Sequence, residues 1–244
     1  MKRVLVLLAS AAFVCAAPAP EAAAAQPQAD TVDPGVPTQL PRTAVPHHYT
    51  LTVTPHADRL TFDGTVQIDL EVVKPTRQLV LNAADLDFSG ARLSSGSSRS
   101  GQVAKVAMDA AAQTATLSFP RSIAAGRYRL TIAYTGKINT QANGLFALDY
   151  KDVDGKAARS LFTQFEAADA RRFVPSWDEP DYKAKWDLTV VVPAKLMPVG
   201  NMPVASSRPL PGGLKQVRFQ TTPTSRPAAG LVIRSKSPSA KNSR

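Results

Sequence analysis

The strand character of the chain is clearest in the run Thr65-Val66-Gln67-Ile68-Asp69-Leu70-Glu71-Val72. Polar and apolar side chains alternate through this run without a break. Because successive side chains of a strand point to opposite faces of a sheet, the run predicts a strand with one face in the core and the other in solvent.

Other runs along the chain show the same pattern. Tyr49–Thr54 and Arg127–Tyr134 also alternate, and shorter strand candidates are Leu79–Leu81, Ala115–Phe119, Leu188–Val192 and Gln216–Gln220. The predicted turns between the strands are Asp63-Gly64, Ser94–Gly101, Ala125-Gly126, Asn143-Gly144, Asp154-Gly155 and Gly212-Gly213. Seven or more strands at this spacing predict an all-β fold, either an antiparallel β-sandwich or curved antiparallel sheets.

The composition narrows the class of protein. A length of 244 residues suits one all-β domain or two small ones, and 20 prolines with 13 glycines argue against long helices. With Cys15 as the single cysteine and only three histidines, the sequence excludes an intrachain disulfide framework, a multi-cysteine zinc site and a His-rich metal centre.

The N-terminus resembles a secretory signal. Lys2 and Arg3 precede the apolar run Val4–Ala17, and Ala23–Ala25 provides a small-residue cleavage site. The run is shorter than the roughly 20 residues that span a bilayer. We therefore predict a signal peptide over residues 1–25, export to the periplasm or the outside, and no membrane attachment after cleavage. A polar stretch over residues 26–39, rich in Pro and Ala, is predicted to be a disordered linker.

Two alternatives to a cleaved signal remain open: an uncleaved anchor, and a lipoprotein signal ending at Cys15. The lipoprotein alternative is weakened because Val14 stands where that signal needs a small residue. Cleavage after Ala25 would leave a mature chain without cysteine.

The segment Thr163–Trp186, with the sequence TQFEAADARRFVPSWDEPDYKAKW, is the most informative for function. It contains both tryptophans of the chain, and Pro175 and Pro180 prevent a long helix. We predict an ordered loop with one helical turn. Long ordered loops that combine charged and aromatic side chains often carry function.

This segment resembles the signature of the M1 zinc aminopeptidases, T-Q-x-E/Q-x-x-D-A-R-R-x-x-P-x-x-D-E-P-x-x-K-A-x-[FW]. The matching positions are Thr163-Gln164-Phe165-Glu166, Asp169-Ala170-Arg171-Arg172, Pro175, Asp178-Glu179-Pro180, Lys183-Ala184 and Trp186. Flanking stretches that also agree are Val45–Tyr49, Phe62–Val66, Asn143–Phe146 and Val199–Pro203. The resemblance implies that residues 40–224 form the saddle-like, mostly antiparallel N-terminal β domain of an aminopeptidase N-like protein, packed on a helical catalytic domain.

The resemblance also implies a substrate-binding role for Gln164 and Glu166, which would face the active site and hold the free N-terminus of a peptide. The chemistry fits, since a carboxylate and an amide oxygen can accept hydrogen bonds from an α-ammonium group. An alternative stays open: Glu166 pairs locally with Arg171 or Arg172, and Gln164 bonds the backbone.

The other charged and aromatic residues of the segment have a structural interpretation. Buried charges persist when they are paired, so we expect Asp169, Arg171, Arg172, Asp178 and Glu179 to brace the loop. Three aromatic residues of the segment are expected to be core or domain-contact residues, namely Trp177, Tyr182 and Trp186.

Family catalysis requires zinc bound by H-E-x-x-H with a downstream glutamate, and a G-x-M-E-N loop. Neither motif occurs in this sequence. His47 and His48 are adjacent at a strand start, where their side chains should diverge, and His56 is expected to lack a carboxylate neighbour at a spacing useful for a metal site. We therefore predict no catalytic residue, metal ligand or cofactor in this chain and no activity of the chain alone, with zinc belonging to the complete enzyme.

The C-terminal stretch from residue 225 to 244 differs in composition from the rest. It contains five basic residues and no acidic one, which is half of the formal net charge of +10. We predict a basic disordered tail, arising either from a shift of reading frame near Thr224 or in a natural short relative. Since so much of the charge is in this tail, the basic balance does not indicate a nucleic-acid partner.

Two functions are compatible with these features. The first is the N-terminal, substrate-side domain of an exported M1 zinc aminopeptidase, truncated before its catalytic domain. In the complete protein its partners would be peptide N-termini and the catalytic domain on which it docks. The alternative is a non-catalytic secreted β-sandwich binding module.

Overall fold

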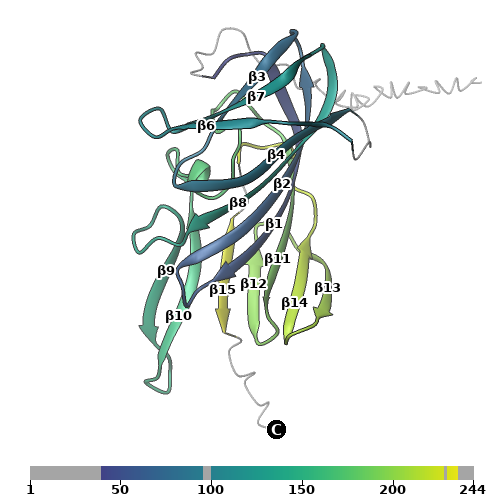
Figure 1. Cartoon of the computed structure of the whole chain (residues 1–244). Coiled ribbons are helices and arrows are strands. Elements are labelled where there is room, and N and C mark those ends of the chain that lie inside the picture. The colour runs from purple at the N-terminus through teal and green to yellow at the C-terminus, as the bar shows by residue number, and fades with distance from the viewer. Residues whose placement is uncertain (1–39, 96–99, 228–229, 236–244) are drawn as a thin grey trace, which may run out of the picture. The chain divides into compact units, whose positions relative to one another are not determined.

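The computed structural model describes residues 40–95, 100–227 and 230–235 (Figure 1). The predicted signal peptide and linker, residues 1–25 and 26–39, lie outside these ranges. No helix within the ranges is long and apolar enough to cross a membrane. The elements are the strands β1 Ala44–His56, β2 Thr61–Val72, β3 Thr76–Asn82, β4 Leu86–Ser95, β5 Gln102–Val103, β6 Lys105–Asp109, β7 Thr114–Ile123, β8 Gly126–Lys137, β9 Gly144–Lys151, β10 Ala157–Gln164, β11 Lys185–Pro193, β12 Leu196–Gly200, β13 Val204–Leu210, β14 Leu214–Phe219 and β15 Leu231–Ser235, and the 3-10 helix η1 Ala170–Arg172.

The predicted all-β fold is confirmed, and the strands form three sheets. The large sheet has eight strands in the order β13-β14-β11-β1-β2-β8-β4-β5, the second has the order β12-β15-β10-β9, and the third has the order β3-β7-β6. All the strand pairs within these sheets are antiparallel except β1 and β11, which run parallel. A purely antiparallel arrangement is therefore wrong at this one pair, which the long connection between β1 and β11 permits.

The strands predicted from alternation are confirmed. In β2, Phe62, Val66, Ile68, Leu70 and Val72 are buried, while the residues between them other than Gly64 are exposed or half-buried. The predicted runs lie within β1, β3, β7, β8 and β11, and β14 ends at Phe219, one residue before the predicted Gln220.

The predicted turn at Asp63-Gly64 is wrong, because both residues lie inside β2. A Cβ atom at Gly64 would lie 2.3 Å from the Cζ atom of Tyr134. Glycine is therefore needed here for the close approach of a buried tyrosine, and not for a turn. The Tyr134 hydroxyl donates a 2.9 Å hydrogen bond to the carbonyl oxygen of Phe173, which ties the large sheet to the signature segment.

The prediction of a disordered tail from residue 225 is wrong for residues 231–235. These residues form β15, which pairs with β12 on one side and β10 on the other. Leu231 and Ile233 are buried in the same apolar core as the rest of the domain. Their alternation with Val232 was the signal for a strand, and the basic composition around it concealed that signal. Residues 228–229 and 236–244 lie outside the described ranges.

A single apolar cluster joins the three sheets. It includes Leu51 and Ile68 of the large sheet, Leu117 of the three-stranded sheet, and Leu161 of the four-stranded sheet. The signature segment contributes its own buried side chains to this cluster and is therefore held by the core.

Candidate functional site

The signature segment connects two of the sheets. It begins as the last residues of β10, contains η1 as its predicted helical turn, and ends as the first residues of β11. The predicted loop over Thr163–Trp186 is therefore shorter by two residues at each end. Its first part belongs to the four-stranded sheet and its last part to the large sheet.

Gln164 and Glu166 are exposed residues at the start of the signature segment. Both are solvent-exposed, whereas Phe165 between them is half-buried and its ring centroid lies 5.5 Å from that of Phe173. Gln164 is paired with Gly144 of β9, and the Glu166–Ala167 peptide bond is cis. The inward Phe165 thus leaves its two polar neighbours facing solvent.

The alternative in which Glu166 pairs with Arg171 or Arg172 is wrong, because both arginines have other partners. Arg171 binds Asp178 at 3.1 Å and Arg172 binds Asp169 at 2.9 Å. Within the described ranges, the side chains of Gln164 and Glu166 make no hydrogen bond or ion pair. Their oxygens are therefore available to a ligand.

The turn that follows Glu166 is held in place by the bonds of Asp169 and Arg172. The amide N–H of Asp169 donates to the carbonyl oxygen of Phe165 at 2.9 Å, and Arg172 pairs with both Asp169 and Asp85. Gly144 has a φ of 60°, and a Cβ atom there would lie 2.9 Å from the Cβ atom of Arg172. Glycine at the start of β9 is therefore required for η1 to pack against that strand.

The predicted bracing by Arg171 and Asp178 is confirmed. The Arg171 Nε atom donates to Asp178 Oδ2 at 3.1 Å, and its Nη2 atom donates to the Asp178 carbonyl oxygen at 3.0 Å. The Asp178 carboxylate also accepts the backbone N–H of Arg171 at 3.2 Å. Both side chains are only 10% exposed, so they form a buried, multiply bonded pair that fixes the loop.

The predicted core role of the aromatic residues is also confirmed. Trp177, Tyr182 and Trp186 are buried, and Trp186 stacks on Tyr49 with ring centroids 3.9 Å apart. The Tyr49 hydroxyl accepts the backbone N–H of Trp177 at 3.1 Å. Burial raises the pKa of the Tyr49 hydroxyl well above its ordinary value, so it remains neutral in this structural role. Glu179 braces the chain as well, because its Oε1 atom accepts the backbone N–H of Leu40 at 3.1 Å.

The histidines do not converge on a metal site. As predicted, His47 and His48 diverge: His47 lies 3.6 Å from Glu71, and His48 lies 3.3 Å from Asp187. His56 has a carboxylate neighbour, because its Nε2 atom lies 2.8 Å from Asp63 across the β1–β2 hairpin. The described part of the chain has no group of three metal-binding side chains and so does not fit the zinc centre that the resemblance implies for the complete enzyme.

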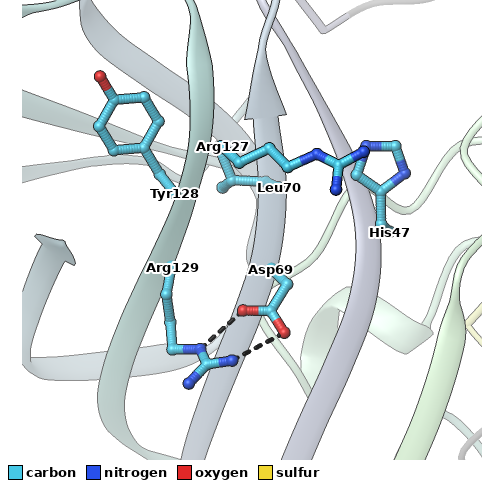
Figure 2. A pocket seen from close by; sticks show the side chains of 6 residues that line it. All are labelled: His47, Asp69, Leu70, Arg127, Tyr128 and Arg129. Atoms are coloured by element: carbon cyan, nitrogen blue, oxygen red, sulfur yellow. Dashed lines mark hydrogen bonds and ion pairs between the residues drawn. The ribbon is translucent and has the colours of Figure 1, made fainter. Parts of the chain in front are cut away.

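The large sheet carries a hollow, lined in part by charged residues, that sequence reasoning did not find. Figure 2 shows its lining, and its volume is about 410 Å³. The Asp69 carboxylate accepts hydrogen bonds of 2.6 and 3.0 Å from Arg129, and these bonds raise the pKa of the arginine. Arg127 extends toward His47, whereas Tyr128 points away from them (Figure 2). No sequence motif joins these residues, which come from β1, β2 and β8. The lining consists of His47, Asp69, Leu70, Arg127, Tyr128 and Arg129.

A comparison with models of protein families shows to which family this chain belongs. The model of the peptidase M1 N-terminal domain matches residues 45–225. The chain belongs to this family. The predicted resemblance to M1 aminopeptidases is therefore confirmed, and both Gln164 and Glu166 lie inside the matched region.

Several M1 aminopeptidases are similar to this domain. Aminopeptidase N of Acetobacter pasteurianus is 42% identical over 185 residues, which cover 76% of this chain and 51% of that protein. Aminopeptidase M1 of Arabidopsis thaliana is 37% identical over 188 residues, covering 76% of this chain and 21% of that protein. The puromycin-sensitive aminopeptidase of Caenorhabditis elegans is 30% identical over 186 residues and is covered to 20%. The chain thus spans about half the length of the Acetobacter relative and about a fifth of the other two.

Proposed function

We propose that this M1 N-terminal domain binds the free N-terminus of a peptide substrate in a complete aminopeptidase, through Gln164 and Glu166. The observation that carries the proposal is that these two residues are exposed and that their side chains make no hydrogen bond or ion pair within the described parts of the chain, whereas the charged residues after them are tied to the core. The family membership supports the same role.

The chemistry of an exopeptidase explains why these residue types suit the role. An α-ammonium group carries a positive charge and N–H donors, which the Glu166 carboxylate and the Gln164 amide oxygen can accept. A hydrogen bond to a charged group contributes about 1.5–3 kcal/mol. Two such acceptors would favour a free N-terminus over an acetylated one, which has lost the charge.

Peptide hydrolysis itself belongs to the rest of the complete enzyme. The histidines of the described ranges are paired with separate carboxylates and do not fit a zinc centre. We therefore propose that this chain supplies recognition of the peptide N-terminus, and we expect no turnover of an alanyl chromogenic amide by the chain alone, with or without added zinc. Turnover that depends on zinc would contradict this division of roles.

The recognition role can be tested by following the backbone amide resonances of the full chain during titration with L-alanine amide. We expect saturable changes at Gln164 and Glu166, and their loss in a Glu166→Ala variant. N-acetyl-L-alanine amide serves as the matched control because it carries no ammonium group. Equal changes with both compounds would contradict the proposal, and no change with either would favour the alternative of a binding module with another ligand.

We further propose that the protein is exported. The basic residues Lys2 and Arg3, the apolar run Val4–Ala17 and the small residues Ala23–Ala25 support this proposal. Mass spectrometry of the protein recovered from a bacterial periplasm should find Gln26 as the first residue. Recovery of the chain with Met1 intact and in the cytoplasm would contradict it.

A further inference from the structure

The hollow on the large sheet contains an arginine without a charged partner. Arg127 lines this hollow together with the ion pair of Asp69 and Arg129. Arg127 is exposed, and within the described ranges its side chain makes no hydrogen bond or ion pair. A guanidinium group stays charged at any pH at which proteins fold, and it carries five N–H donors. The hollow therefore presents a positive charge whose donors the described chain does not use.

The cross-strand neighbour of Arg127 does not neutralise this charge. Glu71 of β2 is directly opposite Arg127 of β8 in the strand register, where opposite charges normally attract each other. The Glu71 carboxylate instead lies 3.6 Å from the Nε2 atom of His47. Figure 2 shows the Arg127 side chain extending along the hollow toward His47. The guanidinium group thus remains available although a carboxylate is its direct strand neighbour.

A β-bulge brings His47 to this position. The register between β1 and β2 shifts between Pro46 and His48, so His47 is the extra residue of β1 and has no partner on β2. A bulge bends its strand locally and redirects the side chain of the extra residue. His47 can therefore both line the hollow and lie beside Glu71.

The other charges of the lining compensate each other. Arg129 donates hydrogen bonds of 2.6 and 3.0 Å to the two oxygens of Asp69. Because this bidentate pair is neutral as a whole, Arg127 supplies the excess charge of the lining. A ligand with one negative charge would match it. A phosphate group, with about 1.5 to 2 negative charges near pH 7, would leave charge unmatched beside Asp69 and Glu71.

We propose that this hollow binds a small organic anion with a single carboxylate group, which Arg127 holds through two parallel N–H···O hydrogen bonds. The planar guanidinium group matches the geometry of a carboxylate. The volume of about 410 Å³ lies in the range of small-molecule sites, roughly 300–1,000 Å³, and leaves room for groups beyond the carboxylate. The ligand differs from the one proposed for Gln164 and Glu166, since it needs a carboxylate and no ammonium group.

The test follows the backbone amide resonances of the full chain during titration with N-acetyl-L-alanine, which has a carboxylate and no ammonium group. We expect saturable changes at Arg127 and at the residues beside it. N-acetyl-L-alanine amide is the matched control because it lacks the carboxylate, and inorganic phosphate should bind more weakly than N-acetyl-L-alanine. A parallel titration with acetate distinguishes the source of the carboxylate: similar affinity indicates a simple acid, and weaker affinity indicates the C-terminus of a peptide.

An Arg127→Gln variant removes the charge but keeps a hydrogen-bonding group, and it should weaken the binding of N-acetyl-L-alanine by about tenfold or more. Since Arg127 is exposed and makes no bond in the described ranges, the variant should retain the unfolding midpoint of the unsubstituted chain. Arg121→Gln is the matched control, because it removes the same charge from an exposed arginine that does not line the hollow.

A Gln164→Ala/Glu166→Ala variant should bind N-acetyl-L-alanine normally, so that this proposal and the proposed function can fail separately. The carboxylate site is overturned by the absence of saturable changes at Arg127 or by equal changes with the amide control. Tighter binding of phosphate, or equal weakening in the Arg127→Gln and Arg121→Gln variants, would also overturn it.

Discussion

The two parts of the signature segment differ in how their charged residues are used. In the part from Asp169 to Trp186, Arg171 and Asp178 are buried and bonded to each other, and the aromatic residues are in the core. In the part from Gln164 to Ala168, the side chains of Gln164 and Glu166 are exposed and make no hydrogen bond or ion pair within the described ranges. The comparison teaches that one sequence signature combines a framework and a binding site, and that burial and bonding partners separate the two.

The largest expected effect is on the framework part. A Trp177→Ala substitution should lower the free energy of unfolding by about 3–5 kcal/mol, because it leaves a cavity in the core. Denaturation of the full chain with urea measures this change. A Leu148→Ala variant is the control, since Leu148 is exposed on the four-stranded sheet, and it should change the free energy of unfolding by no more than about 0.5 kcal/mol. If Trp177→Ala costs no more than this control, the framework interpretation is wrong.

The buried ion pair of the framework should come next. An Arg171→Ala substitution leaves the Asp178 carboxylate buried without its partner and should cost about 3 kcal/mol of unfolding free energy. Arg129, which pairs with Asp69 on the exposed face of the large sheet, is a matched control whose replacement by alanine should cost less than about 1 kcal/mol. Equal losses in the two variants would show that burial does not distinguish the pairs.

The binding part should respond in the opposite way. A Gln164→Ala/Glu166→Ala variant should keep the free energy of unfolding within about 0.5 kcal/mol of the unsubstituted chain, because both side chains are exposed and neither makes a hydrogen bond or ion pair in the described ranges. The same urea denaturation measures it. A loss comparable to that of Arg171→Ala would place these residues in the framework.

The smallest effect concerns an exposed cross-strand pair of β9 and β10, Asp149 and Arg159. The hydrogen bond from Arg159 lowers the pKa of the Asp149 carboxyl. Because the pKa is depressed in the folded state, the pair stabilises the fold above the ordinary carboxyl pKa, and this contribution is lost as the pH falls through the folded-state pKa. Carboxyl resonances followed during an acid titration should show the lowered pKa, and an Arg159→Met variant should raise it. An unchanged pKa in that variant would contradict the assigned cause.

Most of the fold could be predicted from local pattern, and the exceptions have identifiable causes. β2 was predictable because its apolar residues alternate strictly, whereas β15 was missed because basic residues surround its short apolar run. The parallel pairing of β1 with β11 depends on a contact between distant parts of the chain, which no local pattern specifies.

The candidate site also contains some features that the sequence predicts and others that it does not. Gln164 and Glu166 could be identified only through the family signature, because an exposed amide and an exposed carboxylate are common on any surface. The bracing by Arg171 followed from the cost of burying a charge without a partner. The apolar row that crosses the four-stranded sheet was not predicted, since it becomes continuous only when β15 brings Val232 between Phe162 and Val199.

The most direct test of the account is the hydrolysis of L-alanine p-nitroanilide by a chimera in which residues 40–235 replace the corresponding region of Arabidopsis aminopeptidase M1. The account predicts an active chimera in which Glu166→Ala lowers kcat/KM by about tenfold to a hundredfold, the loss expected for one hydrogen bond to a charged group. An Arg129→Ala control should leave kcat/KM unchanged. An active chimera whose kcat/KM is unaffected by both Gln164→Ala and Glu166→Ala would contradict the account.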